Sequence, residues 1–242
     1  MPLKELAERR NLLHRKSDAN TILKHALDDP QIGDTALVSS FGAESIVLLH
    51  MAAMVNRDVP VIFLDTEMLF HETLQYQRDV ADFLELTDVR TVTPSRTNLL
   101  VHDVDGLLHQ VDTDACCDLR KTQPLEAALQ GFGGWITGRK RYHNGQRALL
   151  PVFEKEGRRI KVNPLANWSA DQTRAYMAEH NLPRHPLVAK GYPSIGCWPC
   201  TSRVRNNEHA RAGRWRDSEK SECGIHFPPS TTPSTRNARK SA

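Results

Sequence analysis

The sequence has no apolar run long enough to span a membrane, which takes about 20 residues. The longest candidate, residues 46–55, is interrupted by His50. The first 16 residues mix acidic and basic side chains with scattered leucines, so they resemble neither a secretory signal nor an organellar transit peptide. We therefore expect a cytoplasmic protein with no membrane partner.

Aromatic residues are also scarce, at 6% of 242 positions, and they do not interleave with basic residues as they do in proteins that bind single strands. The charge is uneven: residues 184–242 hold eleven Lys and Arg against four Asp and Glu, while the whole chain carries +3. Such a segment favours an anionic partner, although a solvated basic face has the same composition. We expect no nucleic-acid partner.

Cysteine is sparse and odd in number, with five residues in the chain. An odd count in a reducing compartment argues against a disulfide framework. Four of the five form two tight pairs, Cys116-Cys117 and Cys197-x-x-Cys200, and the fifth is Cys223. This arrangement suggests four ligands and one reactive thiol.

Short β-branched runs alternate with helical patterns along the first 180 residues. Strands alternating with helices favour an α/β fold with a mostly parallel sheet that helices cover on both faces. We expect all of these strands to be buried. Ser169 and Gln172 predict a capping box that opens a helix through His180. The expected strands are residues 35–40, 59–65, 89–93, 134–138 and 160–165, and the other expected helices are residues 44–56, 73–86 and 119–130.

The character of the sequence changes after Leu182. Frequent Pro and Gly predict a loop over residues 183–200. Residues 228–242 contain almost nothing apolar and are expected to be disordered. We therefore expect a single domain over residues 1–227, with a mobile catalytic segment at about 203–227.

The stretch Ser39 to Ser45 joins an expected strand to an expected helix. Small residues and free amide groups at a helix N-terminus attract phosphate or sulfate. It is not a Walker loop, because the Gly-Lys-Ser/Thr ending is missing, and ordinary strand-to-helix turns also use Ser and Gly. It does resemble the serine–glycine loop of the adenine-nucleotide α-hydrolase superfamily. Leu64 and Thr66 stand at the end of the next strand, where that superfamily contacts the nucleotide.

The two cysteine pairs supply four thiolates, the number that a cubane iron–sulfur cluster or a structural zinc ion requires. Spacing alone does not separate these two metals. A redox dithiol is a third reading, because Cys197-Trp198-Pro199-Cys200 superficially resembles the thioredoxin turn. In that fold, however, the turn follows an early strand of a smaller domain.

Cys223 is surrounded in sequence by basic residues that would favour its thiolate form. Further basic clusters lie at residues 139–141 with Arg147, at Lys121, and at Arg211 with Arg214. Arginine forks match phosphate and sulfate oxygens in pairs. Each cluster alone would usually be a solvated face, but each one adjoins another candidate site element.

Together these residues resemble the bacterial type of assimilatory adenylyl-sulfate reductase, in the family that also contains phosphoadenylyl-sulfate reductases. One departure is Ile225, where the family usually has leucine. The resemblance rests on SSFGAES from Ser39, FLDT from Phe63, CCDLRKTQPL from Cys116, WITGRKR from Trp135, KVNPLANW from Lys161, LPRHPLVAKGYPSIGCWPC from Leu182, GRW from Gly213 and KSECGIH from Lys220.

The resemblance implies a 4Fe–4S cluster on Cys116, Cys117, Cys197 and Cys200, and an adenine-nucleotide α-hydrolase-like fold. Cys223 would attack the sulfur of adenylyl sulfate and release AMP, and thioredoxin or glutaredoxin would then attack Cys223 and release sulfite. The chain would form a homo-oligomer. Carried over position by position, Ser39, Ser40, Gly42, Glu44 and Ser45 line the anion loop, Leu64 and Thr66 approach the adenosine, Lys121 lies between cluster and substrate, Arg147, Arg211 and Arg214 hold the phosphosulfate, and His226 accompanies the nucleophile.

Other functions stay open on the sequence. Residues 139–141 could hold the 3′-phosphate of phosphoadenylyl sulfate, which would make the enzyme dual in specificity or a user of that nucleotide. An ATP-pyrophosphatase-type ligase or sulfurtransferase would share the anion loop but would not require the Cys223 motif. A cluster-bearing nucleic-acid regulator would use the basic C-terminal segment.

Overall fold

The computed structural model describes residues 1–143, 147–216, 220, 222 and 224–226. Two expectations lie outside these residues: the placement of Cys223 and the disordered tail over residues 228–242. Within the described ranges, every helix is too short or too polar to cross a membrane.

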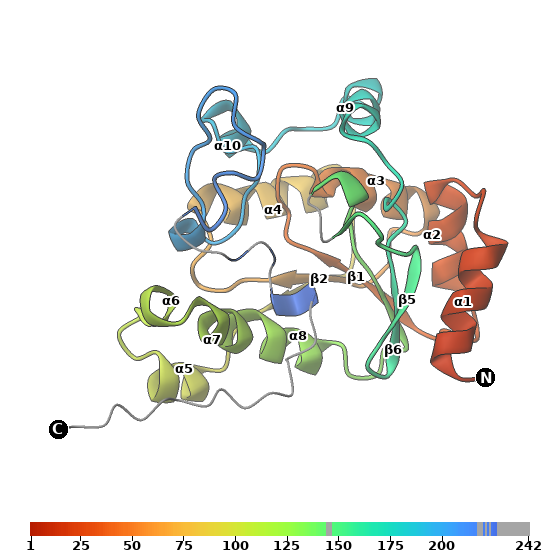
Figure 1. The fold of residues 1–242 in the computed structure, drawn as a ribbon, viewed down its shortest axis with the longest axis horizontal. Coiled ribbons are helices and arrows are strands. Elements are labelled where there is room, and N and C mark those ends of the chain that lie inside the picture. Colours follow the sequence, from red (N-terminus) through yellow and green to blue (C-terminus); the bar gives the residue numbers. More distant parts are fainter. Residues whose placement is uncertain (144–146, 217–219, 221, 223, 227–242) are drawn as a thin grey trace.

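A six-stranded sheet forms the centre of the described part of the chain, in the order β3-β2-β1-β4-β6-β5 (Figure 1). Neighbouring strands are parallel except for β5 and β6. The predicted mostly parallel sheet is therefore confirmed, and the five expected strands form within three residues of their expected bounds. The strands are β1 (Thr35–Ser39), β2 (Val61–Leu64), β3 (Val89–Val92), β4 (Gly134–Ile136), β5 (Phe153–Glu156) and β6 (Arg159–Val162).

Two details of the sheet differ from the prediction. β5 was not expected, because its sequence Phe-Glu-Lys-Glu is mostly charged. It is an antiparallel edge strand, where charged side chains are favoured, and Gly157 at φ 55° makes the turn into β6. β3 was expected to be buried, but it lies at the opposite edge and exposes Arg90 and Thr91.

Helices cover both faces of the sheet (Figure 1). On one side lie α3 (Ser45–Val55) and α4 (His71–Phe83), and on the other α8 (Gln123–Ala128) with α5 (Arg96–His102), α6 (Leu108–Val111) and α7 (Thr113–Cys117). The N-terminal helices α1 (Leu3–Leu13) and α2 (Ala19–Asp28) were not predicted. They extend the apolar core beside β5 and β6.

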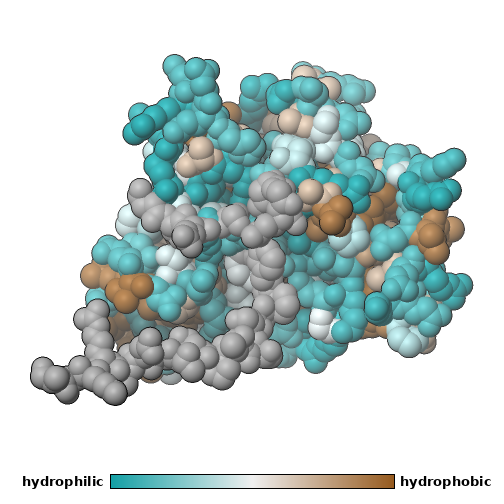
Figure 2. Space-filling view, in the orientation of Figure 1, coloured by the Kyte–Doolittle hydropathy of each residue, from teal (hydrophilic) through white to brown (hydrophobic). Residues whose placement is uncertain are grey.

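The two apolar cores follow from the alternation of side chains along each strand. Leu37, Phe63 and Ile136 face the larger core, which α1, α2, α3 and α4 complete. Val38 and Trp135 face the smaller core, which includes Leu125 and Leu129 of the α8 region. The surface is mostly hydrophilic in Figure 2, with a hydrophobic patch near α6, where Leu107 and Val111 are exposed.

The segment after β6 is partly as predicted. Ser169 and Gln172 form the expected capping box of α9 (Ala170–Glu179), with hydrogen bonds in both directions. The segment 183–200, expected to be a loop, contains the short helix α10 (Pro186–Ala189) and the single 3₁₀ turn η4 (Trp198–Cys200). In both, proline stands in the first turn, a position that tolerates it.

His185 fastens this segment to α4. Its ring is 1% exposed, its Nδ1 accepts a hydrogen bond from the Leu187 amide (3.2 Å), and its Nε2 lies 3.1 Å from the Thr73 hydroxyl. Since Nδ1 accepts, the proton belongs on Nε2, and the ring is neutral. Burial lowers the pKa of His185 to about 4.

The lowered pKa of His185 predicts acid sensitivity. Between pH 6.5 and about 4 the unfolded chain binds a proton at this position and the folded chain does not. The free energy of unfolding should therefore fall by up to about 3 kcal/mol across this window. The substitution His185→Asn keeps an acceptor for Leu187 but does not titrate. Urea unfolding at pH 8 and pH 5 should show a clearly smaller pH effect in the variant, and equal pH effects would refute this role.

Candidate active site

A cavity of about 260 Å³ opens where the carboxyl ends of β1, β2 and β4 meet. β2 and β3 lie on one side of β1, and the chain then crosses to place β4 on the other side. The carboxyl ends of β1 and β4 therefore form the topological switch point, where α/β sheets usually bind ligands. The cavity is lined by all twelve residues expected to contact substrate: Ser39, Ser40, Gly42, Glu44, Ser45, Leu64, Thr66, Lys121, Arg147, Arg211, Arg214 and His226.

Two backbone amides of the anion loop, which were expected from the sequence to be free, are hydrogen-bonded within the loop. The Ser39 hydroxyl accepts a hydrogen bond from the Phe41 amide (3.1 Å), and the Ser45 hydroxyl accepts one from the Gly42 amide (3.0 Å). Phe41 takes φ 46° and packs edge-on against Phe63 below the loop, with ring centroids 5.3 Å apart. The loop therefore passes directly from β1 into α3 and presents its serines to the cavity.

Glu44 ties this loop to the segment that follows β4. Its carboxylate accepts hydrogen bonds from Lys140 Nζ (2.9 Å) and the Tyr142 hydroxyl (2.7 Å), and lies 3.1 Å from His143 Nε2. Burial alone would raise the pKa of Glu44, but His143, Lys140 and Tyr142 together hold it well below its usual range. Glu44 thus stays ionised and fixes three side chains around the loop.

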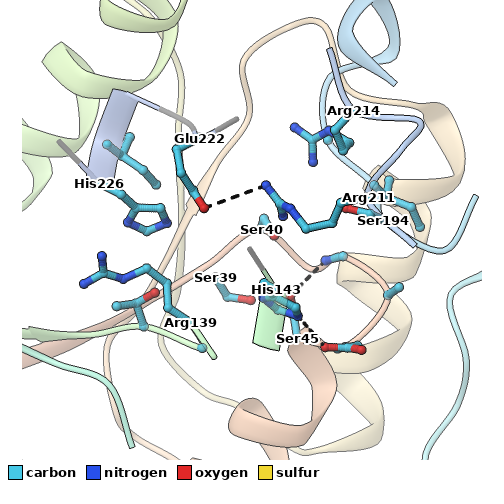
Figure 3. Close-up of a pocket in the computed structure, with 18 of the residues that line it drawn as sticks. Ser39, Ser40, Ser45, Arg139, His143, Ser194, Arg211, Arg214, Glu222 and His226 are labelled. Atoms are coloured by element: carbon cyan, nitrogen blue, oxygen red, sulfur yellow. Dashed lines mark hydrogen bonds and ion pairs between the residues drawn. The ribbon is translucent and has the colours of Figure 1, made fainter. Parts of the chain in front are cut away.

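Arg147 and Glu222 form a bidentate pair at the cavity wall. Arg147 Nε donates to Glu222 Oε1 (2.5 Å) and Nη2 donates to Oε2 (2.6 Å). Both side chains are less than a tenth exposed. Figure 3 shows Glu222 reaching toward Arg211, whose guanidinium lies 3.9 Å away, with His226 on the adjoining wall. The sequence did not predict this role for Glu222, which directly precedes Cys223.

Arg214 lies against both an aromatic ring and a glycine. Its guanidinium is centred 4.4 Å from the Trp215 ring, and it packs directly on Gly196, where a Cβ would stand 2.3 Å from Nη2. The buried Arg214 Nε has no hydrogen-bond partner among the described residues. Gly196 precedes the ligand candidate Cys197, so the same turn positions a guanidinium and a thiol.

His226 stacks on Trp135 with the two rings nearly parallel and 6.3 Å apart. Burial and the nearby cations Lys161, Arg139, Arg147 and Arg211 lower its pKa well below 6.5. A neutral imidazole therefore lines the cavity. Trp135 was not singled out for this role, and its indole also hydrogen-bonds Glu156 (2.7 Å).

The four paired cysteines meet at a second, small cavity beside the first. Cys116 and Cys117 end α7, and Cys197 and Cys200 flank and close the turn η4. All four line this cavity together with Lys121 and Arg120. No three His, Cys, Asp or Glu side chains of the described residues converge on the position of a single metal ion.

Thr66 and Lys121 lie between the two cavities. The Thr66 hydroxyl is 3.2 Å from Cys197 Sγ, and Thr66 also lines the larger cavity. Lys121 borders both cavities. It belongs to η1 (Asp118–Thr122), a π-helical turn inserted between α7 and α8. Such turns are rare and are frequent at functional sites.

Arg120 of the same turn is an anchor for the cysteine pair. Its Nε and Nη2 donate to Asp103 Oδ2 (3.0 and 2.6 Å), and its Nη1 donates to the Thr66 carbonyl (2.9 Å). Arg120 is 6% exposed, and the Asp103 side chain is fully buried. The pair joins the cysteine-bearing helix to the end of β2.

A model of the phosphoadenosine phosphosulfate reductase domain matches residues 34–203 of this sequence. The chain belongs to this family. It is 53% identical over 196 residues to an adenosine 5′-phosphosulfate reductase of Mesorhizobium japonicum, covering 80% of this chain and 76% of that one. It is 40% identical over 231 residues to an adenosine 5′-phosphosulfate reductase of Streptomyces coelicolor, covering 93% and 94%.

Solved structures agree with this family. A phosphoadenylyl-sulfate reductase from Candida auris superposes with a TM-score of 0.69 at 29% identity, covering 83% of this chain and 97% of that one. An FMN adenylyltransferase from Candida glabrata reaches a TM-score of 0.55 at 14% identity, covering 85% and 75%. The second likeness concerns the fold alone, and it matches the expected adenine-nucleotide α-hydrolase-like architecture.

The close packing of Arg214 on Gly196 predicts a substitution that changes ligand binding without changing the stability of the fold. The substitution Gly196→Ala places a methyl group where the guanidinium now lies, so Arg214 has to move while the backbone keeps an allowed conformation. We expect weaker nucleotide binding, by roughly tenfold for one lost charged hydrogen bond, and a melting temperature close to that of the wild type. Isothermal titration with AMP and a thermal melt would measure both. Unchanged AMP affinity would contradict the placement of Arg214 at the ligand.

Proposed function

We propose that this protein reduces adenylyl sulfate to sulfite and AMP, with Cys223 as the nucleophile. The observation that carries the proposal is the common location of its parts. Glu222, Ile225 and His226, which flank Cys223 in sequence, line the same cavity as the anion loop and the arginines. These sequence neighbours support the proposal that the Cys223 thiol acts at this cavity.

In the first step the Cys223 thiolate attacks the sulfur of the sulfate group. A sulfur–sulfur bond forms, the bond from sulfur to the bridging oxygen breaks, and AMP leaves with that electron pair. The products are AMP and an S-sulfocysteine at position 223. Lys121, Arg211 and Arg214 line the cavity, so they are suited to stabilise the charge that develops on the departing phosphate.

In the second step a dithiol protein such as thioredoxin or glutaredoxin supplies the two electrons. Its thiolate attacks Cys223 Sγ, sulfite leaves with the electron pair of the sulfur–sulfur bond, and a mixed disulfide remains. The second thiol of the reductant then resolves this disulfide, which restores the Cys223 thiol and leaves the reductant oxidised.

A 4Fe–4S cluster is the group that we propose for the four-thiol cavity. The cysteine donors are all sulfur and come from two separate segments, a donor set that such a cluster uses. Cys116, Cys117, Cys197 and Cys200 would hold the cluster, which would contribute a fixed negative charge beside the substrate. Lys121 would separate that charge from the phosphosulfate, and Thr66 would donate a hydrogen bond to the Cys197 sulfur.

The internal pairing of the basic segment after β4 favours the nucleotide without a 3′-phosphate. Arg139 bonds Glu154 and Asn163, Lys140 bonds Glu44, and Arg141 Nε donates to the Leu150 carbonyl. A 3′-phosphate brings about two further negative charges and needs basic groups of its own. We therefore propose adenylyl sulfate as the preferred substrate.

Sulfite formation from the two nucleotides tests this function. Purified protein with thioredoxin and adenylyl sulfate should release sulfite and AMP in equal amounts. Catalytic efficiency on phosphoadenylyl sulfate should be lower by about 10²-fold or more, because roughly 3 kcal/mol separates a paired from an unpaired buried phosphate. Equal efficiencies would indicate dual specificity, and no sulfite from either nucleotide would refute the proposed reaction.

The cluster has its own test. Protein purified without oxygen should be brown and contain about four iron and four sulfide per chain. Cys197→Ser should lose the colour and part of the local fold, since ligand loss couples to folding. Cys223→Ser is the matched control and should keep iron and sulfide at the wild-type level. Stoichiometric zinc in active, colourless protein would contradict the assignment.

A further inference from the structure

Two oppositely charged residues just before Cys223 are held by opposite sides of the site. Lys220 Nζ donates to the Asp114 carboxylate and to the Thr113 carbonyl (3.4 Å), both on α7. It also interacts with the Cys117 side chain. Glu222 is held by both nitrogens of the Arg147 fork, as described above. The first contact lies on the cysteine side, and the second lies on the cationic side of the larger cavity.

Both charges are largely removed from water. The Glu222 side chain is 4% exposed, and the Lys220 side chain is 11% exposed against an Asp114 side chain that is 87% exposed. Because unpaired buried charges are strongly disfavoured, Glu222 cannot leave Arg147 without a penalty, and the contact of Lys220 adds a weaker second point. Exchanging the two partners would place Glu222 against Asp114 and Lys220 against Arg147, which puts like charges together. The two contacts therefore favour one alignment of Lys220 and Glu222 with their partners.

The Glu222 contact is continuous with the anion loop. Arg147 Nη1 lies 3.0 Å from His143 Nδ1, and His143 Nε2 lies 3.1 Å from Glu44 in the loop. Cys223 directly follows Glu222 in the sequence. The residue immediately before the thiol is thus tied to the loop expected to bind the phosphosulfate.

We propose that Lys220 and Glu222 are positioning residues for the thiol: a two-point electrostatic anchor that sets the register of the chain before Cys223 between the cysteine side and the cationic side of the site. This rests on the proposed function for the identity of the reaction. The anchor itself is a property of described residues and can be measured without turnover.

The substitution Glu222→Gln tests the anchor, because amide replaces carboxylate at nearly constant shape. Single-turnover formation of the Cys223 adduct at saturating adenylyl sulfate should slow by at least about tenfold, toward the 10²-fold that a misplacement of about 1 Å can produce. The dissociation constant of AMP should stay within about threefold of the wild type. Lys220→Met should behave in the same way, and Lys220→Arg should restore most of the rate.

A second measurement does not depend on catalysis. Hydrogen exchange at the amides of Gly224, Ile225 and His226 should be faster in Glu222→Gln and in Lys220→Met than in the wild type. The control is Glu85→Gln, which removes the same charge from the exposed pair with Arg57 and should change neither exchange nor rate.

The outcomes separate the alternatives. Tighter AMP binding in Glu222→Gln without slower adduct formation would show that Glu222 competes with the substrate for Arg147, and it would overturn the anchor. Unchanged exchange at residues 224–226 would overturn it as well. Failure of the wild type to form any adduct would refute the proposed reaction, while the exchange comparison would still decide whether the anchor exists.

Discussion

The buried ion pair of Arg120 and Asp103 is the interaction on which the arrangement of both cavities depends. It fixes the π-helical turn after Cys117, and its third bond, to the Thr66 carbonyl, holds that turn against the end of β2. Thr66 in turn lies against Cys197. Two cysteine segments more than 75 residues apart are therefore brought together at one strand end. Removing either member of a buried pair of this kind costs about 3–5 kcal/mol, because the other charge stays buried.

The second organising feature is the distribution of cations among internal acids. Lys140 is bound by Glu44, Arg139 by Glu154, and Lys161 by Glu156. Arg139, Lys140 and Glu44 line the cavity, while their partner Glu154 and the pair of Lys161 and Glu156 are not among its lining residues. Lys121, Arg211 and Arg214 line the same cavity and are the cations proposed to meet the ligand. A site built in this way is cationic without holding a large unbalanced charge, which a buried location would penalise.

Much of this could be predicted from local sequence. The anion loop depends on one strand, one turn and one helix that follow each other in the sequence. The cysteine motifs are likewise short and local, so both features could be recognised from the sequence pattern. Long-range charge pairing could not be found this way, since Glu222 and Arg147 are 75 residues apart. β5 was missed because an edge strand does not need alternating apolar residues. The prediction that β3 is buried was wrong because the local sequence does not specify the order of strands in the sheet. The short helix after His185 was not predicted because it begins with Pro186, although proline fits the first turn of a helix.

The central claim of this account is that Cys223 becomes S-sulfonated. The most direct measurement gives the protein adenylyl sulfate without any reductant and weighs its peptides by mass spectrometry. The account predicts the mass of one sulfonate group on the peptide that contains Cys223, AMP released in equal amount, and no adduct in Cys223→Ser. An adduct on Cys197 or Cys200, or full turnover by Cys223→Ser, would contradict it.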